Sequence, residues 1–150
     1  MSAALRLARP EDLDRVLSLV AAFHSEEGIV QDQDQRRSAL LPLLEGIPHG
    51  CIYLIGPARA PLGYAIITFG WSVEFGGMDA FLDEIYIRPA VRGRGIASEV
   101  LHDLPKALAE AGVCAIHLEV NRENETAQRL YERAGFCLRA KYLLMSKRLT

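Results

Sequence analysis

Two spacings of apolar residues divide the chain into predicted helices and strands. Apolar residues at helical spacing predict helices over residues 10–25, 32–46, 94–111 and 125–133. Short apolar or alternating runs predict strands over residues 3–9, 51–55, 62–69, 78–87, 115–120, 136–140 and 141–147. Pro42 and Pro105 lie inside predicted helices, and we expect a bend or a restart at each because proline removes a helical hydrogen bond.

The order of these elements predicts a single α/β (α+β) domain over residues 1–150. Residues 78–120 form a strand–helix–strand unit, so its two strands are expected to be parallel neighbours with a right-handed crossover. The full pattern predicts a mixed, mostly antiparallel twisted sheet of about six to seven strands with about four helices. Ligands in such sheets bind at the carboxyl ends of the strands, so a ligand site is predicted at the end of residues 78–87.

Composition narrows the class of protein. A chain of 150 residues with 50% hydrophobic and 24% charged residues is typical of a soluble globular domain. The net charge of −2 lacks the positive excess of a nucleic-acid surface, and we expect no nucleic-acid partner. No apolar run approaches a membrane span and no signal peptide is recognisable, so a cytoplasmic protein without a membrane partner is predicted. Cys51, Cys114 and Cys137 lack C-x-x-C spacing and are expected to be buried core residues.

The stretch that follows residues 78–87 predicts a phosphate-binding turn. Gly93 and Gly95 free the backbone of Cβ atoms, and the next helix presents unpaired N–H groups and its positive dipole end. Arg88, Arg92 and Arg94 add positive charge. The Gly-x-Gly-x-x-Gly dinucleotide fingerprint is incomplete, although Glu119 imitates its acidic residue, and the Walker A sequence is absent. A tight turn with solvated arginines remains an alternative.

Two sequence blocks resemble the GNAT superfamily of acyl-CoA N-acyltransferases. Arg92-x-x-Gly95-x-Ala97 fits the signature of that family. The segment Asn124-x-x-Ala127-x-x-Leu130-Tyr131-Glu132-x-x-Gly135-Phe136 fits a second block, in the same order along the chain. The resemblance implies an acetyl-CoA-dependent N-acetyltransferase that moves an acetyl group directly to a primary amine, with coenzyme A as cosubstrate and no metal.

The resemblance assigns the cofactor site to three groups of residues. The pyrophosphate would lie on the signature turn, formed by Arg92, Gly93, Arg94, Gly95, Ile96, Ala97 and Ser98. The pantetheine arm would pair with the backbone of Ile85, Tyr86 and Ile87, where the parallel central strands splay apart. The second block would contribute Asn124, Ala127 and Tyr131. Asn124 is equally suited to capping the helix that follows it.

Catalysis by direct transfer needs an acid and a base. By resemblance, Tyr131 lies near the thioester sulfur and protonates the leaving thiolate, although a core tyrosine is the alternative. A lysine-like amine has a pKa of about 10.4 and must lose a proton before attack. Glu84 is the first candidate for the base and Asp83 the second, because both carboxylates stand in an otherwise apolar strand. The alternative for Glu84 is a structural ion pair with an arginine.

The acceptor is the least defined part of the prediction. Glu26, Glu27, Glu74 and Asp83 fall in segments that flank the acceptor groove of this fold, and their charge favours a small cationic amine. Protein lysines or N-termini, a non-catalytic acyl-CoA-binding module and an oxidoreductase-type nucleotide-binding domain remain alternatives. The isolated histidines, including His24, are assigned no catalytic role. A homodimer is possible in folds of this kind.

Overall fold

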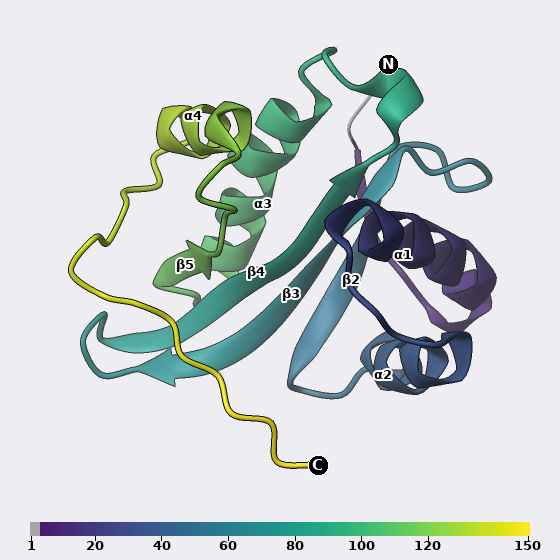
Figure 1. Cartoon of the computed structure of the whole chain (residues 1–150), viewed down its shortest axis with the longest axis horizontal. Helices are drawn as coiled ribbons and strands as arrows, with labels where there is room; N and C mark the ends of the chain where they lie inside the picture. Colours follow the sequence, from purple (N-terminus) through teal and green to yellow (C-terminus); the bar gives the residue numbers. More distant parts are fainter. Residues whose placement is uncertain (1–3) are drawn as a thin grey trace. The chain divides into compact units, whose positions relative to one another are not determined.

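The computed structural model describes residues 4–150, which form two compact units (Figure 1). One unit ends at Glu119, and the other spans Val120–Thr150. Each unit is described by itself. The predicted strand at the N-terminus begins at Ala3, which lies outside the described residues.

The first unit is built on a sheet with the strand order β1-β2-β3-β4-β5. The strands are β1 (Leu5–Leu7), β2 (Gly50–Ile55), β3 (Gly63–Ser72), β4 (Gly77–Ile87) and β5 (Ala115–Leu118). The first four strands pair antiparallel in chain order, and β5 pairs parallel to β4. The predicted strand–helix–strand unit is therefore present, but its parallel pair, β4 and β5, lies at one edge of the described sheet and not at its centre.

Helices cover both faces of this sheet. A 3-10 turn (Pro10–Asp12) leads into α1 (Leu13–Glu27), which is followed by α2 (Gln33–Glu45). A second 3-10 turn (Pro89–Val91) precedes α3 (Ile96–Glu110), which lies on the opposite side of the sheet from α1 and α2 (Figure 1). The core beneath α1 and α2 contains Val16, Leu17, Val20, Leu40, Leu44, Ile52, Leu54, Tyr64, Ile66 and Tyr86. Residues 64, 66 and 86 thus face α1, as strand alternation requires.

The second unit contains α4 (Glu125–Arg133) and the chain that follows it. The Asn124 side chain caps α4 by accepting a hydrogen bond from the Ala127 N–H at 3.1 Å. The backbone turns sharply after α4 at Gly135, whose φ of 98° is left-handed. The rings of Tyr131 and Phe136 then meet edge to face at 6.0 Å.

The described part of the chain has five strands in its sheet, so the prediction of about six to seven strands was wrong. The missing strands are residues 136–140 and 141–147, which contain no strand in the structure. Their composition favours extended backbone, but a strand also needs a neighbour to supply its ladder hydrogen bonds. Within the described residues, no strand of the sheet pairs with this segment.

Two smaller expectations concern the prolines and the cysteines. α2 and α3 continue through Pro42 and Pro105, so neither helix restarts at its proline. Cys51 is half-buried, and Cys114 and Cys137 are exposed rather than in the core. Val113, the neighbour of Cys114, is buried. Because successive side chains point to opposite sides in extended backbone, Cys114 is on the exposed side.

Asp12 ties the start of α1 to β1 and gives a testable contribution to stability. Its carboxylate accepts hydrogen bonds from Arg6 at 3.0 and 3.1 Å and from the Arg9 N–H at 2.9 Å. We expect Asp12→Asn to lower the free energy of unfolding by about 2 kcal/mol in urea denaturation at pH 7, because these bonds are made to a charged group. The matched control, Asp14→Asn on the exposed side of α1, should change it by less than about 0.5 kcal/mol.

The same ion pair has a defined pH dependence. The hydrogen bond from Arg6 lowers the pKa of Asp12 below its ordinary value, against the opposing effect of burial. The stabilisation is therefore complete above the unfolded-state pKa of about 3.9 and is lost as the pH falls through the lower folded-state pKa. Equal unfolding free energies for Asp12→Asn and Asp14→Asn at pH 7 would contradict this assignment.

Candidate active site

β4 carries the candidate site because it continues beyond its partner β5. The two strands pair from Asp79↔Ala115 to Leu82↔Leu118, and β5 then ends while β4 runs on to Ile87. Asp83 lies at an irregularity in the ladder with β3, since Ile66 pairs with Glu84 and Ile67 with Leu82. A bulge of this kind bends a strand and redirects its side chains. Beyond Leu82, no described strand pairs with Asp83–Ile87 on the side of β5, and the Ile87 carbonyl accepts a hydrogen bond from Arg92 Nε.

The turn between β4 and α3 has the properties of an anion site. Gly93 and Gly95 have φ values of 79° and 78°, a conformation that residues with a Cβ adopt only with strain. A Cβ built on either glycine would have no atom within 4 Å, so open space lies in front of the backbone. From Gly93 to Ser98, no backbone N–H has an acceptor among the described residues. These donors, at the positive end of α3, are suited to phosphate oxygens.

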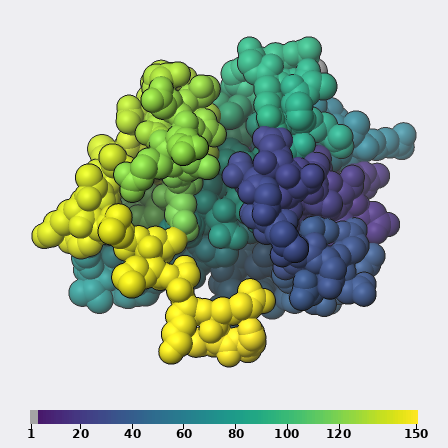
Figure 2. All heavy atoms as spheres, in the orientation of Figure 1, coloured from purple at the N-terminus to yellow at the C-terminus, as the bar shows by residue number. Residues whose placement is uncertain are grey.

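The three arginines of this turn have different surroundings. Arg88 donates to the Pro61 carbonyl at 2.7 Å. Arg92 donates to the Ile87 carbonyl at 2.8 Å and to Glu26 at the end of α1 at 2.7 Å, with its guanidinium 5.5 Å from the centre of the Tyr86 ring. Figure 2 shows the turn, in teal, beside the end of α1, in dark blue. Arg92 therefore braces the turn, whereas the exposed Arg94 has no hydrogen-bond or ion-pair partner in the described chain.

Glu84 is held on the α1 face of β4 by two donors. The Tyr64 hydroxyl donates to its Oε1 at 2.7 Å, and His24 Nε2 lies 2.9 Å from its Oε2. The Glu84 side chain is 16% exposed and that of His24 is 7% exposed. Burial, together with the charge of Glu84, raises the pKa of Tyr64 far above its ordinary value. Tyr64 thus stays a protonated donor, and Glu84 is a carboxylate with fixed orientation and partial access to solvent.

His24 connects Glu84 to α2. Its second ring nitrogen, Nδ1, accepts a hydrogen bond from Arg36 Nε at 3.3 Å. Arg36 is 8% exposed, and its other guanidinium nitrogens donate to the Gln33 side chain at 2.6 Å and to the Gln31 carbonyl at 2.8 Å. Among residues 4–150, Glu84 forms no direct ion pair with an arginine, and Arg36 is linked to it through the imidazole of His24.

The other predicted acidic residues have varied positions. Asp83 occupies the bulge of β4, and partial desolvation followed by the charges of Glu84 and Glu119 raises its pKa. Glu26 is engaged by Arg92, and Glu27 is exposed at the end of α1. Glu74 is exposed in the hairpin between β3 and β4. The structure therefore groups Glu84 and Asp83 on β4, Glu26 and Glu27 at the end of α1, and leaves Glu74 in the hairpin.

The residues of the second block lie in the Val120–Thr150 unit. Asn124 caps α4 through Ala127, which is the structural role that the sequence offered as an alternative. Tyr131 is half-buried and its ring contacts Phe136. Their proposed contacts with coenzyme A and with the thioester sulfur stay predictions from the resemblance.

His24, Arg36 and Tyr64 are the site residues that sequence reasoning missed. The spacing of His24 and Arg36 from the buried apolar residues of their helices could have identified these two residues. His24 continues the buried stripe of Val16, Leu17 and Val20 at a helical interval of four, so it had to lie against the sheet. Arg36 is likewise four positions before Leu40 on the buried side of α2. A polar residue on such a stripe requires a polar partner, and Glu84 is the carboxylate in the middle of the facing strand.

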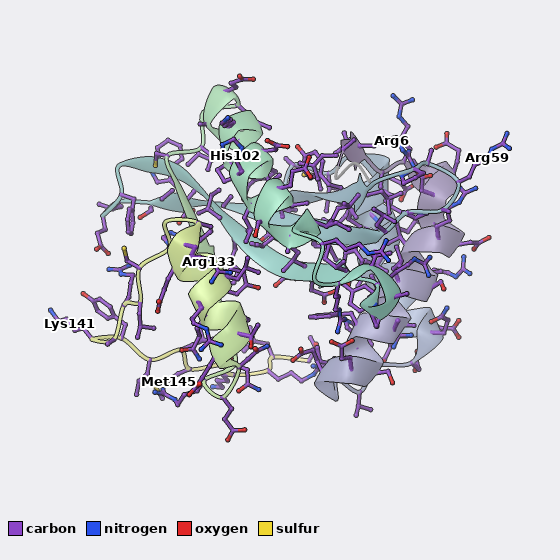
Figure 3. All side chains as sticks on the ribbon, turned by 90° about the horizontal axis from the view of Figure 1, so that it is seen from above. Arg6, Arg59, His102, Arg133, Lys141 and Met145 are labelled. Carbon is purple, nitrogen blue, oxygen red and sulfur yellow. The ribbon has the colours of Figure 1, made fainter. Side chains whose placement is uncertain are left out.

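The remaining histidines lie elsewhere. His102 is on α3, paired with its neighbour Asp103, and is two-thirds exposed (Figure 3). His117 of β5 lies 3.1 Å from Asp79 of β4, and its ring contacts Phe75 at 5.0 Å. In residues 4–150, no three His, Cys, Asp or Glu side chains are grouped as a metal site would require. None of the described helices is long and apolar enough to cross a membrane.

Comparison with known proteins identifies the family. The profile of the acetyltransferase (GNAT) family matches residues 13–136, which include β4, the glycine turn, α3 and α4. The chain therefore belongs to the acetyltransferase (GNAT) family, and the resemblance seen in the sequence is confirmed. An integron cassette protein from the mobile metagenome of Cole Harbour Salt Marsh has the same fold, with a TM-score of 0.84 and 29% identity over 97% of this chain and 90% of that chain.

Two curated relatives are named as N-acetyltransferases. An uncharacterized N-acetyltransferase of Mycobacterium bovis is 32% identical over 88 residues, which are 56% of this chain and 56% of that protein. The thialysine N-epsilon-acetyltransferase of Bos taurus is 30% identical over 74 residues, 49% of this chain and 43% of that protein. The chain thus spans about half the length of the curated relatives that it matches.

Proposed function

We propose that the protein is an acetyl-CoA-dependent N-acetyltransferase that moves an acetyl group directly to the primary amine of a small cationic acceptor. The observation that carries this proposal is the run of unpaired N–H groups from Gly93 to Ser98, directly after a strand that holds a half-buried carboxylate, Glu84. Phosphate recognition and a general base thus lie on one continuous segment. The family match over residues 13–136 crosses the boundary between the two units, which supports one catalytic domain over residues 1–150.

The donor would be held mainly by backbone. The N–H groups of Gly93–Ser98 and the free charge of Arg94 are suited to the pyrophosphate of coenzyme A. The unpaired edge of Asp83–Ile87 on the side of β5 is suited to hydrogen-bond with the amide groups of an extended pantetheine arm. Coenzyme A supplies the acetyl thioester, whose carbonyl carbon is the electrophile.

The acceptor and leaving group each need a proton transfer. Glu84 takes a proton from the ammonium form of the acceptor, and the neutral amine then forms a C–N bond with the thioester carbonyl carbon as the C–S bond breaks. Tyr131 is proposed to give its phenolic proton to the leaving thiolate. This role rests on the family resemblance of the segment from Asn124 to Phe136.

The proposed acceptor class rests on charge. The carboxylates of Glu84 and Asp83 lie on β4, and the exposed Glu27 ends the helix that carries His24. A cationic amine is attracted to such a site before it is deprotonated. One relative is named for acetylation of the epsilon nitrogen of thialysine, which agrees with a small amine as acceptor. Protein lysines or N-termini are the alternative acceptors.

The experiment that tests this function is a thiol-release assay with acetyl-CoA and a panel of acceptors. The panel should contain diamines, polyamines, amino acids, amino sugars and lysine peptides. We expect thiol release that depends on a cationic small amine, with the acetylated product identified by mass spectrometry. Binding of acetyl-CoA by thermal shift without transfer to any acceptor would support a non-catalytic module, and stabilisation by NAD alone would contradict the proposal.

A further inference from the structure

The contact between Arg36 and His24 fixes the position of a proton. Arg36 Nε lies 3.3 Å from His24 Nδ1, and a guanidinium nitrogen can only donate a hydrogen bond. His24 Nδ1 must therefore offer its lone pair, which leaves the imidazole proton on Nε2. That proton points to Glu84 Oε2 at 2.9 Å, where a carboxylate oxygen accepts it. The geometry thus defines one tautomer of His24.

From this geometry we propose that Arg36 is a positioning residue that keeps His24 in the neutral Nε2–H tautomer, so that Glu84 is oriented by neutral donors and stays free to accept the proton of the acceptor amine. The inference rests on the proposed function, since it assigns Glu84 as the base. It adds a residue on α2 that contacts neither Glu84 nor the coenzyme A turn in the described structure.

Arg36 opposes the charged form of His24 directly. Protonation of Nδ1 would place an N–H opposite the Arg36 N–H and a positive imidazole beside a positive guanidinium. The other groups that face His24 are Glu84 and Asp83 on β4, whose charges favour an imidazolium, and Tyr64 on β3, which is neutral. An imidazolium would form an ion pair with Glu84 and make that carboxylate a poorer base. The contact with Arg36 prevents this pairing.

Arg36 is itself rigidly held, as a positioning residue must be. Its Nη1 donates to Gln33 at 2.6 Å and its Nη2 to the Gln31 carbonyl at 2.8 Å, so each guanidinium nitrogen has a partner. Asp32 caps α2 through the Gln35 N–H at 2.7 Å, which fixes the start of the helix from which Arg36 projects. The connection from α1 to α2 is thereby tied to the orientation of Glu84.

The first test reads the tautomer in the unmodified protein. In ¹⁵N-histidine-labelled protein at pH 7, long-range ¹H–¹⁵N NMR spectra should show His24 with an unprotonated Nδ1 and a protonated Nε2. The His24→Gln variant assigns the signals, because it removes one imidazole from the spectrum. An Nδ1–H tautomer or an imidazolium at pH 7 would overturn the proposal, whatever the activity of the enzyme.

The second test removes the donor from Arg36. Arg36→Met should lower kcat roughly tenfold at pH 7, because the lost hydrogen bond holds His24, which in turn orients Glu84. The KM for acetyl-CoA should change little, because Arg36 does not contact the coenzyme A turn. The His24 signals should then no longer show the Nε2–H tautomer alone. Arg37→Met, on the exposed side of the same helix, is the matched control and should behave as wild type. Unchanged kcat in a folded Arg36→Met variant would refute the positioning role.

A pair of variants at position 24 covers the case in which Arg36→Met does not fold. His24→Gln places a permanently neutral N–H near the position of Nε2, whereas His24→Leu has no donor. We expect the glutamine variant to be about tenfold more active than the leucine variant. Equal activity would contradict the role of a neutral donor. If the NMR result holds while Glu84→Gln keeps full activity, the base assignment fails and the tautomer assignment stands.

Discussion

Replacing Glu84 with glutamine is expected to lower kcat at pH 7 by about a hundredfold to a thousandfold, the range for loss of a general base. The amide has nearly the shape of the carboxylate, so it can accept from His24 and donate to the Tyr64 oxygen. The fold and the KM for acetyl-CoA should therefore stay close to wild type. Steady-state kinetics with the best acceptor from the panel, together with a measurement of Tm, would check both parts.

The pH dependence of this variant separates a base from a structural carboxylate. Near pH 10 a lysine-like acceptor with a pKa of about 10.4 is roughly a quarter neutral in solution, against less than about 0.1% at pH 7, so the need for a base decreases and the deficit of Glu84→Gln should shrink. Asp83→Asn tests the second candidate, and Glu110→Gln on exposed α3 surface is the control. If Asp83→Asn shows the larger loss and the pH-dependent recovery, Asp83 is the base. A lowered Tm with unchanged kcat would instead indicate a structural role for Glu84.

Replacing Gly95 with leucine is expected to raise the KM for acetyl-CoA about a hundredfold. The new side chain would project into the open space before the turn and keep phosphate oxygens away from several N–H donors between Gly93 and Ser98. Each of those bonds is made to a charged ligand and is stronger than a neutral one. The transfer step does not involve this turn, so kcat at saturating acetyl-CoA should change little.

A matched glycine controls for backbone strain. Gly76, in the hairpin between β3 and β4, has a φ of 91° and no atom within 4 Å of a built Cβ, as at Gly95. Gly76→Leu should therefore lose a similar amount of stability, about 1–2 kcal/mol, and leave the KM for acetyl-CoA unchanged. Isothermal titration with coenzyme A would measure binding apart from turnover. Similar coenzyme A affinities for the two variants would show that the turn after β4 does not bind the donor.

The segment from β4 to α3 could be predicted from the sequence because its structure depends on local chemistry. An apolar run, two glycines and a helix start define a strand, a left-handed turn and an unpaired helix terminus without reference to distant residues. The predicted ranges 78–87 and 94–111 agree with β4 and α3 to within two residues at each end. The family was also predicted from this β4–α3 segment, together with the block from Asn124 to Phe136.

The surroundings of Glu84 could not be predicted in the same way. His24 lies 60 positions earlier in the sequence and reaches the carboxylate only when α1 packs on the sheet. Tyr64 lies 20 positions earlier and reaches it through the pairing of β3 with β4. Arg92 similarly meets Glu26 across 66 positions, a contact that leaves their predicted roles toward the cofactor and the acceptor as predictions. Such pairings depend on helix rotation and strand register, which no short-range pattern contains.

The sequence by itself determined the parallel strand–helix–strand unit, the glycine turn and the family, since each rests on residues close together in the chain. Tertiary structure decided how many strands the sheet has, because residues 136–147 have extended propensity but no pairing partner among the described strands. It also decided which donors orient Glu84. Residues that are neighbours in the chain predict a phosphate site in the turn after β4, whereas the contacts of Glu84 with His24 and Tyr64 form only in the folded chain.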